Sequence, residues 1–188
     1  MIRFTLAFFL GAMMMIDAVC GEMVTVTSEV RSGNSVITSH GKGVCVEIPG
    51  VDCLLVATAW HVVNDGGEIK VKFVDGTHKC PIWKADKEKD IVLLKTPFSN
   101  VEKTVGYVPS RDFDADIMHA WNQRGATVEM SVALEKFDSG DSGSPVWRAD
   151  KLTGIAVSQV VSRGDKAVKN EAVVIPAQYL LKLAARKD

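Results

Sequence analysis

Residues 23–95 carry a succession of short segments rich in valine, isoleucine, threonine and aromatic side chains, and this pattern limits the possible folds most strongly. Glycine, proline, asparagine or aspartate lies between most of the segments, as is typical of strands joined by turns. Short strands at near-regular spacing without intervening helices indicate a sandwich or a barrel. The expected strands cover residues 23–27, 36–39, 43–48, 53–58, 69–73, 80–85 and 91–95.

A second group of strand-like segments follows a more polar connector over residues 96–111. These segments have a similar composition and a similar separation by turn residues. The sequence therefore predicts an all-β fold of two antiparallel six-stranded β-barrels, over about residues 22–95 and 112–175. The expected strands of the second barrel are 116–121, 126–133, 144–148, 153–161 and 167–175.

The last part of the chain changes from strand to helical periodicity. Pro176 suits the first turn of a helix. The residues that then recur at helical spacing are Tyr179, Leu180, Leu183 and Ala184. We expect a C-terminal α-helix over residues 176–187 that packs on the second barrel.

Composition excludes some classes of partner. Of the 188 residues, 47% are hydrophobic and 24% are charged, as in soluble globular proteins. Lysine and arginine number 22 against 23 aspartate and glutamate residues, so the chain has no overall positive field. We therefore expect no nucleic-acid partner.

The N-terminal residues differ from the rest of the chain. After Arg3, residues 4–16 are almost wholly apolar, and small residues follow them. One positive charge, a short apolar run and small residues are typical of a signal peptide, here residues 1–21, with cleavage after Cys20 or Gly21. We expect a secreted or periplasmic protein with no stable membrane contact. An uncleaved N-terminal membrane anchor is the alternative.

Cleavage would leave three cysteines, so at most one pair can form within the chain. Cys45 and Cys53 flank a Pro-Gly turn signal, whereas Cys80 lies further along. A disulfide between Cys45 and Cys53 depends on the register of the two strands, because a shift of one residue turns a side chain to the opposite face. The cysteines do not have the paired spacing of a zinc site.

Ser142 lies in a turn of small residues, between Gly140 and Gly143. Glycine permits backbone conformations that other residues avoid and lets a substrate approach closely. Such a turn can present a serine hydroxyl as a nucleophile. An ordinary surface loop is the alternative, because glycine, aspartate and serine are common in turns.

A serine nucleophile needs a base and an acid that orients it. Of the four histidines, His61 follows an apolar strand and a small-residue turn, and Asp90 precedes another apolar strand. Taken singly, His61 has the ordinary explanation of a core or rim residue. Asp90 equally suits a strand cap, and Asp86 is a nearby competitor.

Three segments taken together carry a resemblance to a known family. In chain order they are Thr58-Ala59-Trp60-His61, Asp90-Ile91-Val92-Leu93-Leu94 and Gly140-Asp141-Ser142-Gly143-Ser144-Pro145. They resemble the three signature segments of chymotrypsin-like serine proteases, and the resemblance extends over residues 22–188. Trp60 stands where alanine is usual, and Ser144 stands where many members have a second glycine.

The resemblance implies a serine endopeptidase that acts on polypeptides without a metal or organic cofactor. Ser142 would attack the peptide carbonyl, His61 would transfer the proton, and Asp90 would orient the imidazole. The backbone N–H groups of Gly140 and Ser142 would form the oxyanion hole. A side chain at Gly140 is expected to disturb the loop.

The type of chymotrypsin-like protease is less well defined. The chain lacks the Ile-Val-Gly-Gly terminus that digestive-type zymogens release, yet it keeps Asp141, the residue that pairs with that terminus. Either Asp141 has another partner or activation differs. The short spacings resemble the compact proteases of arteriviruses and astroviruses. Residues 41–44 and 173–176 resemble periplasmic heat-shock proteases.

Four residues are candidates for substrate binding. Aligning the family's segments places Lys136 near the base of the specificity pocket and Ala156, Ser158 and Gln159 along its wall and the substrate-pairing strand. An inward-pointing Lys136 would favour acidic substrates. A solvated Lys136 on a loop is the alternative.

A catalytically silent binding module with a protease fold is the competing hypothesis for function. Such modules usually lose the serine, the histidine or a glycine of the turn, and this chain retains all of them.

Overall fold

The computed structural model describes residues 23–63, 67–99, 113–114, 117–123, 126–133, 139–148, 151–161 and 170–186. The predicted signal peptide and residues 100–111 of the expected connector lie outside these ranges. No helix within the described ranges is long and apolar enough to cross a membrane.

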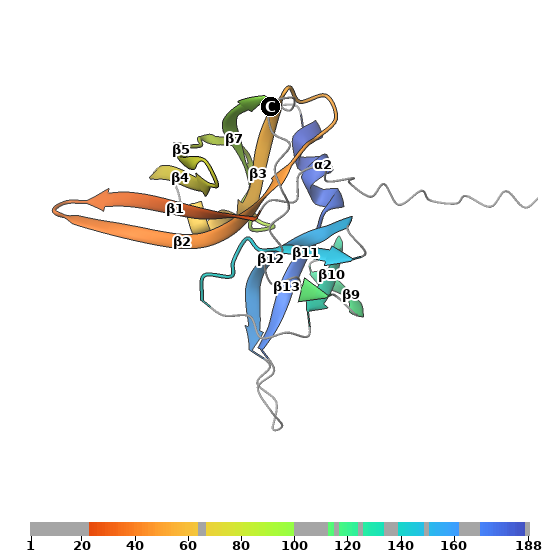
Figure 1. Cartoon of the computed structure of the whole chain (residues 1–188). Helices are drawn as coiled ribbons and strands as arrows, with labels where there is room; N and C mark the ends of the chain where they lie inside the picture. The colour runs from red at the N-terminus through yellow and green to blue at the C-terminus, as the bar shows by residue number, and fades with distance from the viewer. Residues whose placement is uncertain are drawn as a thin grey trace, which may run out of the picture.

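The described chain forms two β-sheets and two helices (Figure 1). The first sheet has the order β5-β4-β1-β2-β3-β7-β6, and all of its neighbouring strands are antiparallel. Its strands are β1 (Met23–Ser32), β2 (Ser35–Val46), β3 (Cys53–Ala59), β4 (Glu68–Phe73), β5 (Gly76–Lys79), β6 (Ile82–Asp86) and β7 (Ile91–Ser99). The short helix α1 (Trp60–Val63) follows β3 directly.

The second sheet has the order β8-β11-β12-β13-β10-β9. Its strands are β8 (Phe113–Asp114), β9 (Ile117–Gln123), β10 (Ala126–Ala133), β11 (Pro145–Arg148), β12 (Lys151–Val161) and β13 (Asn170–Pro176). Strand β8 pairs parallel to β11, and the other pairs are antiparallel. Helix α2 (Gln178–Ala185) ends the described chain. The predicted all-β fold with a C-terminal helix is confirmed.

The first sheet has seven strands, one more than a six-stranded barrel, and they differ from the seven expected segments in two places. Strand β2 runs unbroken through two of the expected segments, because its glycines do not interrupt the pairing with β1. Strand β5 was not expected, because Gly-Thr-His-Lys lacks the composition that predicts a strand. Residues 96–99 of the expected connector continue β7.

The first sheet curls so that its edge strand β5 contacts β7. The ring of Phe98 on β7 meets the edge or face of two rings from the other end of the sheet. Its centroid lies 5.2 Å from that of Phe73 on β4 and 4.9 Å from that of His78 on β5. The Lys95 N–H also donates to the Pro81 carbonyl at 2.9 Å. The ring contacts join β7 to strands at the other end of the sheet order and account for the barrel-like form, whereas the Lys95 bond joins β7 to the segment before its neighbour β6.

Strands β3 and β7 lie next to each other in the first sheet and carry its core. Leu54 to Ala59 are all buried, as are Ile91 to Leu94. A strand with one solvated face would alternate between buried and exposed residues. Both faces of β3 are covered, and β3 contacts β12 of the second sheet. The contact between the two sheets therefore involves β3, the strand that leads directly into α1.

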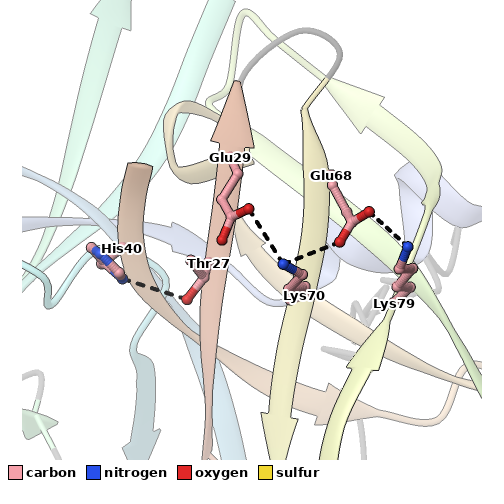
Figure 2. Close-up of polar contacts among 6 residues, drawn as sticks. All are labelled: Thr27, Glu29, His40, Glu68, Lys70 and Lys79. Carbon is pink, nitrogen blue, oxygen red and sulfur yellow. Dashed lines mark hydrogen bonds and ion pairs between the residues drawn. The ribbon is translucent and has the colours of Figure 1, made fainter. Parts of the chain in front are cut away.

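The β1–β2 hairpin extends from the body of the molecule (Figure 1). Near the hairpin, a row of ion pairs links β1, β4 and β5 (Figure 2): Lys70 Nζ lies 3.3 Å from Glu29 and 3.1 Å from Glu68, and Lys79 Nζ lies 2.7 Å from Glu68. Hydrogen bonds from Lys79 and Lys70 lower the pKa of Glu68. Hydrogen bonds to Glu68 and Glu29 raise the pKa of Lys70. Because the row is exposed, we expect it to influence strand pairing more than overall stability.

Helix α2 contacts β13 of the second sheet, the barrel on which the sequence predicted it to pack, and also β6 of the first. Lys84 Nζ on β6 donates to the Ala184 carbonyl at 3.0 Å and also to the Arg186 carbonyl. Arg186 lies 2.6 Å from the Asp86 carboxylate. Pro176 ends β13 rather than beginning the helix, so α2 starts at Gln178. The C-terminal segment thus crosses from the second sheet to the first.

Within the described residues, the three cysteines form no disulfide. Cys45 on β2 lies opposite Val56, which is three residues from Cys53 along β3. This register keeps the two thiols apart, so the proposed disulfide does not form in this structure.

Candidate active site

His61 and Asp90 are held together by two hydrogen bonds. The backbone N–H of His61 donates to Asp90 Oδ1 at 2.8 Å, and His61 Nδ1 lies 2.7 Å from Asp90 Oδ2. An ionised carboxylate only accepts hydrogen bonds, so the imidazole carries its proton on Nδ1. The Nε2 atom of a neutral ring then has a free lone pair and can accept a proton.

Helix α1, which carries His61, is anchored at both ends. The Trp60 N–H donates to the Asp90 carbonyl at 3.1 Å. At the other end, the Ser28 hydroxyl on β1 donates to the Val63 carbonyl at 2.6 Å, and this contact is buried. Fixed ends limit the movement of a helix of one turn. The histidine ring is therefore positioned by the backbone as well as by the carboxylate.

Asp90 has an unusual backbone conformation. Its φ angle is 54°, and it is the one non-glycine residue with positive φ within the described ranges. The Asp90 N–H donates to the Lys87 carbonyl at 3.3 Å, which closes the turn before β7. The ammonium group of Lys87 also lies 4.7 Å from the centre of the Trp60 ring. A costly backbone conformation that is held on both sides is common at functional sites.

The competing aspartate, Asp86, has other partners. Its carboxylate accepts from the Lys89 N–H at 3.2 Å and pairs with Arg186. Burial raises the pKa of Asp86, but the hydrogen bonds from Arg186 and Lys89 outweigh it, so the pKa lies below the usual range. The structure therefore brings Asp90, and not Asp86, to His61.

The turn around Ser142 depends on two glycines for different reasons. Gly143 has a φ of +89°, and a Cβ there would lie 1.8 Å from the Lys42 carbonyl oxygen and 2.4 Å from Thr58 Oγ1. At Gly140, φ is +92° but no atom would lie within 4 Å of a Cβ. Gly140 is thus required by its left-handed backbone rather than by crowding. Gly143 is required by both.

Ser142 lies against the part of the first sheet that leads to His61. The Lys42 N–H on β2 donates to the Ser142 carbonyl at 2.7 Å. A Cβ on Gly41 would lie 2.7 Å from the same carbonyl oxygen and 2.5 Å from Val62 Cγ2, the residue after His61. Gly41 therefore lets the serine turn and α1 approach each other. Among the described residues no hydrogen bond joins the Ser142 hydroxyl to the His61 ring.

Two backbone N–H groups of the turn have no acceptor among the described residues. The Gly143 N–H donates to the Ala156 carbonyl at 2.7 Å, and the Ser144 N–H donates to the Asp141 carbonyl at 3.0 Å. The N–H groups of Gly140 and Ser142 donate to no acceptor within the described part of the chain. The sequence predicted these two groups as the oxyanion-hole donors, and that role stays a prediction.

Asp141 pairs with a lysine from the other sheet. Lys42 Nζ lies 2.7 Å from Asp141 Oδ1, and the two side chains are 27% and 10% exposed. The sequence had left the partner of Asp141 open. Lys42 was missed as a site residue, although its position between Gly41 and Gly43 was a usable signal: glycines inside a strand often mark a close backbone approach.

The predicted substrate-binding residues are described only in part. Lys136 lies outside the described residues. Ala156 is fully buried, its N–H donates to the Ser144 carbonyl at 2.8 Å, and its carbonyl accepts from Gly143, so it supports the serine turn. Ser158 and Gln159 pair with β13 just beyond an irregularity in β12, and their side chains are outside the described set. The substrate-binding roles of all four stay predictions.

Within the described residues, no group of three or more histidine, cysteine, aspartate or glutamate side chains is arranged to hold a metal ion.

No family model and no curated protein matches the sequence. Among solved structures, the chain is similar to the active form of the Rv3671c protease from M. tuberculosis, with a TM-score of 0.61 and 16% sequence identity. The match covers 89% of this chain and 81% of that chain. At this identity the likeness shows the fold and leaves the activity to experiment. The chain has a protease fold of the chymotrypsin-like type.

Proposed function

We propose that this protein is a serine endopeptidase in which His61, Asp90 and Ser142 form the catalytic triad. The observation that carries the proposal is the double hydrogen bond between His61 and Asp90, which fixes the ring and its tautomer. The approach of the Ser142 turn to α1 supports it, as do the N–H groups of Gly140 and Ser142, which have no acceptor in the described part of the chain.

In this mechanism Ser142 Oγ attacks the peptide carbonyl carbon while its proton moves to His61 Nε2. The N–H groups of Gly140 and Ser142 stabilise the oxyanion, and Asp90 stabilises the charged imidazole. Collapse of the tetrahedral intermediate releases the amine, which takes the proton from Nε2. Water then attacks the acyl-enzyme and gives a proton to His61, which returns it to Ser142 Oγ.

Labelling with a serine-directed fluorophosphonate tests the proposal. We expect the wild-type protein to be labelled and to hydrolyse casein. Ser142→Ala should abolish both reactions, and His61→Ala should nearly abolish them. Ser35→Ala and His40→Ala serve as matched controls, because both residues are exposed on the hairpin strand β2. A wild-type protein that is never labelled, or a Ser142→Ala variant that still hydrolyses casein, would refute the proposal.

A catalytically silent binding module of the same fold is the second candidate. The observation that favours it is the missing hydrogen bond between Ser142 and His61 in the described structure. Catalytic hydrogen bonds are often long without substrate and shorten when it binds. The labelling experiment separates the two candidates, because a binding module would fold normally and remain unlabelled.

The proposal includes substrate choice and destination. Lys136 would favour acidic residues before the scissile bond, which cleavage of a peptide library by the wild type and by Lys136→Ala would test.

Residues 1–21 would direct the protein to a secretory pathway and be removed. Terminal sequencing of secreted material should then begin at Gly21 or Glu22, and a mature chain that begins at Met1 would contradict this.

A further inference from the structure

The ion pair between Lys42 and Asp141 joins the two sheets beside the candidate nucleophile. Lys42 belongs to β2 of the first sheet, whereas Asp141 precedes β11 of the second. The Asp141 side chain is 10% exposed, and its Oδ1 lies 2.7 Å from Lys42 Nζ. A buried ionised carboxylate is costly unless a cation and hydrogen bonds compensate it. Lys42 supplies such a cation.

The backbone of Lys42 contacts the next two residues of the turn. Its N–H donates to the Ser142 carbonyl at 2.7 Å. Its carbonyl accepts from the Thr58 hydroxyl at 2.5 Å and occupies the space that a Cβ on Gly143 would need. One residue of the first sheet thus contacts three successive residues of the serine turn.

The peptide that follows Asp141 carries the Ser142 N–H, one of the two donors with no acceptor among the described residues. The Asp141 carbonyl accepts from the Ser144 N–H at 3.0 Å, and the described chain has no cis peptide bond. In a trans peptide the C=O and N–H point in opposite directions. The Ser142 N–H therefore points away from Ser144. The orientation of this peptide depends on where the Asp141 side chain is held.

We infer that Lys42 is a positioning residue that anchors Asp141 and so keeps the Gly140 and Ser142 donors aimed at the oxyanion. This inference rests on the proposed function and adds a rule of activation to it. The ammonium group belongs to a side chain inside the fold. The site is therefore complete once the chain has folded, and it needs no α-amino group released by cleavage.

Substitution of Lys42 tests the anchor. For Lys42→Met we expect kcat to fall by roughly 100-fold or more, about the effect of losing one oxyanion donor, while KM changes by less than about threefold. Lys42→Arg keeps the charge and should retain activity within about tenfold of the wild type. Lys72→Met is the matched control: Lys72 is exposed on β4 and, like Lys42, lies opposite Thr25 of β1. It should leave kcat unchanged.

A second variant keeps the test decisive if Lys42→Met does not fold. Asp141→Asn leaves Lys42 in place, with enough exposure to remain solvated, and should lower kcat by a similar factor. For folded Lys42→Ala, added ethylammonium should restore part of kcat, whereas tetramethylammonium, which has no N–H donor, should not. A purely structural role for Lys42 would give no such selective rescue.

The activation rule has its own test. A protein with an uncleaved extension before Glu22 should be labelled by the fluorophosphonate as fast as the protein that begins at Glu22. A wild type that is never labelled refutes the proposed function itself. A labelled wild type with equally reactive Lys42→Met and Asp141→Asn variants refutes only the anchor. Labelling that requires removal of the extension refutes the activation rule.

Discussion

Asp90 binds His61 through both of its carboxylate oxygens, one contacting the backbone N–H at 2.8 Å and the other the ring nitrogen Nδ1 at 2.7 Å. The backbone bond fixes the position of the carboxylate, and the ring bond fixes the tautomer. Asp90 accepts both bonds from a left-handed backbone conformation that few aspartates adopt.

Asp90→Asn should separate these two functions. An amide can still accept one hydrogen bond but can also donate to Nδ1, which would favour the wrong tautomer of His61. We expect kcat to fall by about 10³- to 10⁴-fold with little change in fold. Casein hydrolysis and circular dichroism measure the two effects. Asp86→Asn is the control from the same turn, and equal activity losses in both variants would contradict the assignment of Asp90.

Substitutions of glycine should distinguish backbone conformation from crowding. Gly140→Ala meets no neighbouring atom, so it should cost only the left-handed strain, about 1–2 kcal/mol of the free energy of unfolding. Gly50→Ala is the matched control, because Gly50 also has positive φ and open space but lies far along the chain from the serine turn. Both should lower the melting temperature similarly, and Gly140→Ala alone should lower the rate of fluorophosphonate labelling.

Gly143→Ala should be far more damaging than either of these changes. Its Cβ would overlap the Lys42 carbonyl and the Thr58 hydroxyl, which belong to the other sheet. We expect the sheets to separate locally and activity to be lost. The free energy of unfolding should fall by about 4 kcal/mol, the scale of severe core substitutions. Urea unfolding measures the cost. A Gly143→Ala protein as stable as Gly140→Ala would show that this contact is wrong.

Acid should loosen the attachment of the C-terminal helix. The pKa of Asp86 lies below its usual range in the folded protein, so its pairing with Arg186 stabilises the fold fully above the unfolded pKa of about 3.9. That contribution is lost as the pH falls through the lower folded value. The difference in stability between the wild type and Asp86→Asn, measured by urea unfolding, should therefore be larger at pH 7 than at pH 3. A difference that does not change with pH would contradict the ion pair.

The cysteines should differ in their reactivity. Burial raises the pKa of the Cys80 thiol to about 11, so it is almost wholly protonated at pH 8 and should resist iodoacetamide. Cys45 is also buried, whereas Cys53 is partly exposed. Peptide mapping should find Cys53 labelled first and the other two labelled only after unfolding. Rapid labelling of Cys80 in the folded protein would contradict its burial.

The sequence determined the features that depend on neighbouring residues. Strand composition, turn residues and the change of period after residue 175 predicted an all-β fold with a terminal helix. The settings of His61, Asp90 and Ser142 were also local, because each lies at the end or start of an apolar strand or between glycines. Local composition wrongly predicted two strands in place of β2 and missed β5. Pairing with the neighbouring strands β1 and β4 outweighs composition at these places.

Only the tertiary structure decided which distant residues meet. It gave His61 to Asp90 rather than to Asp86, and it paired Lys42 with Asp141 across a separation of 99 residues. It also kept Cys45 from Cys53 and brought α2 into contact with β6 as well as with β13. Each of these outcomes depends on strand register and on how two sheets pack, where a shift of one residue turns a side chain to the opposite face. Local sequence does not encode that register, because it is set by burial and contacts summed over the whole fold.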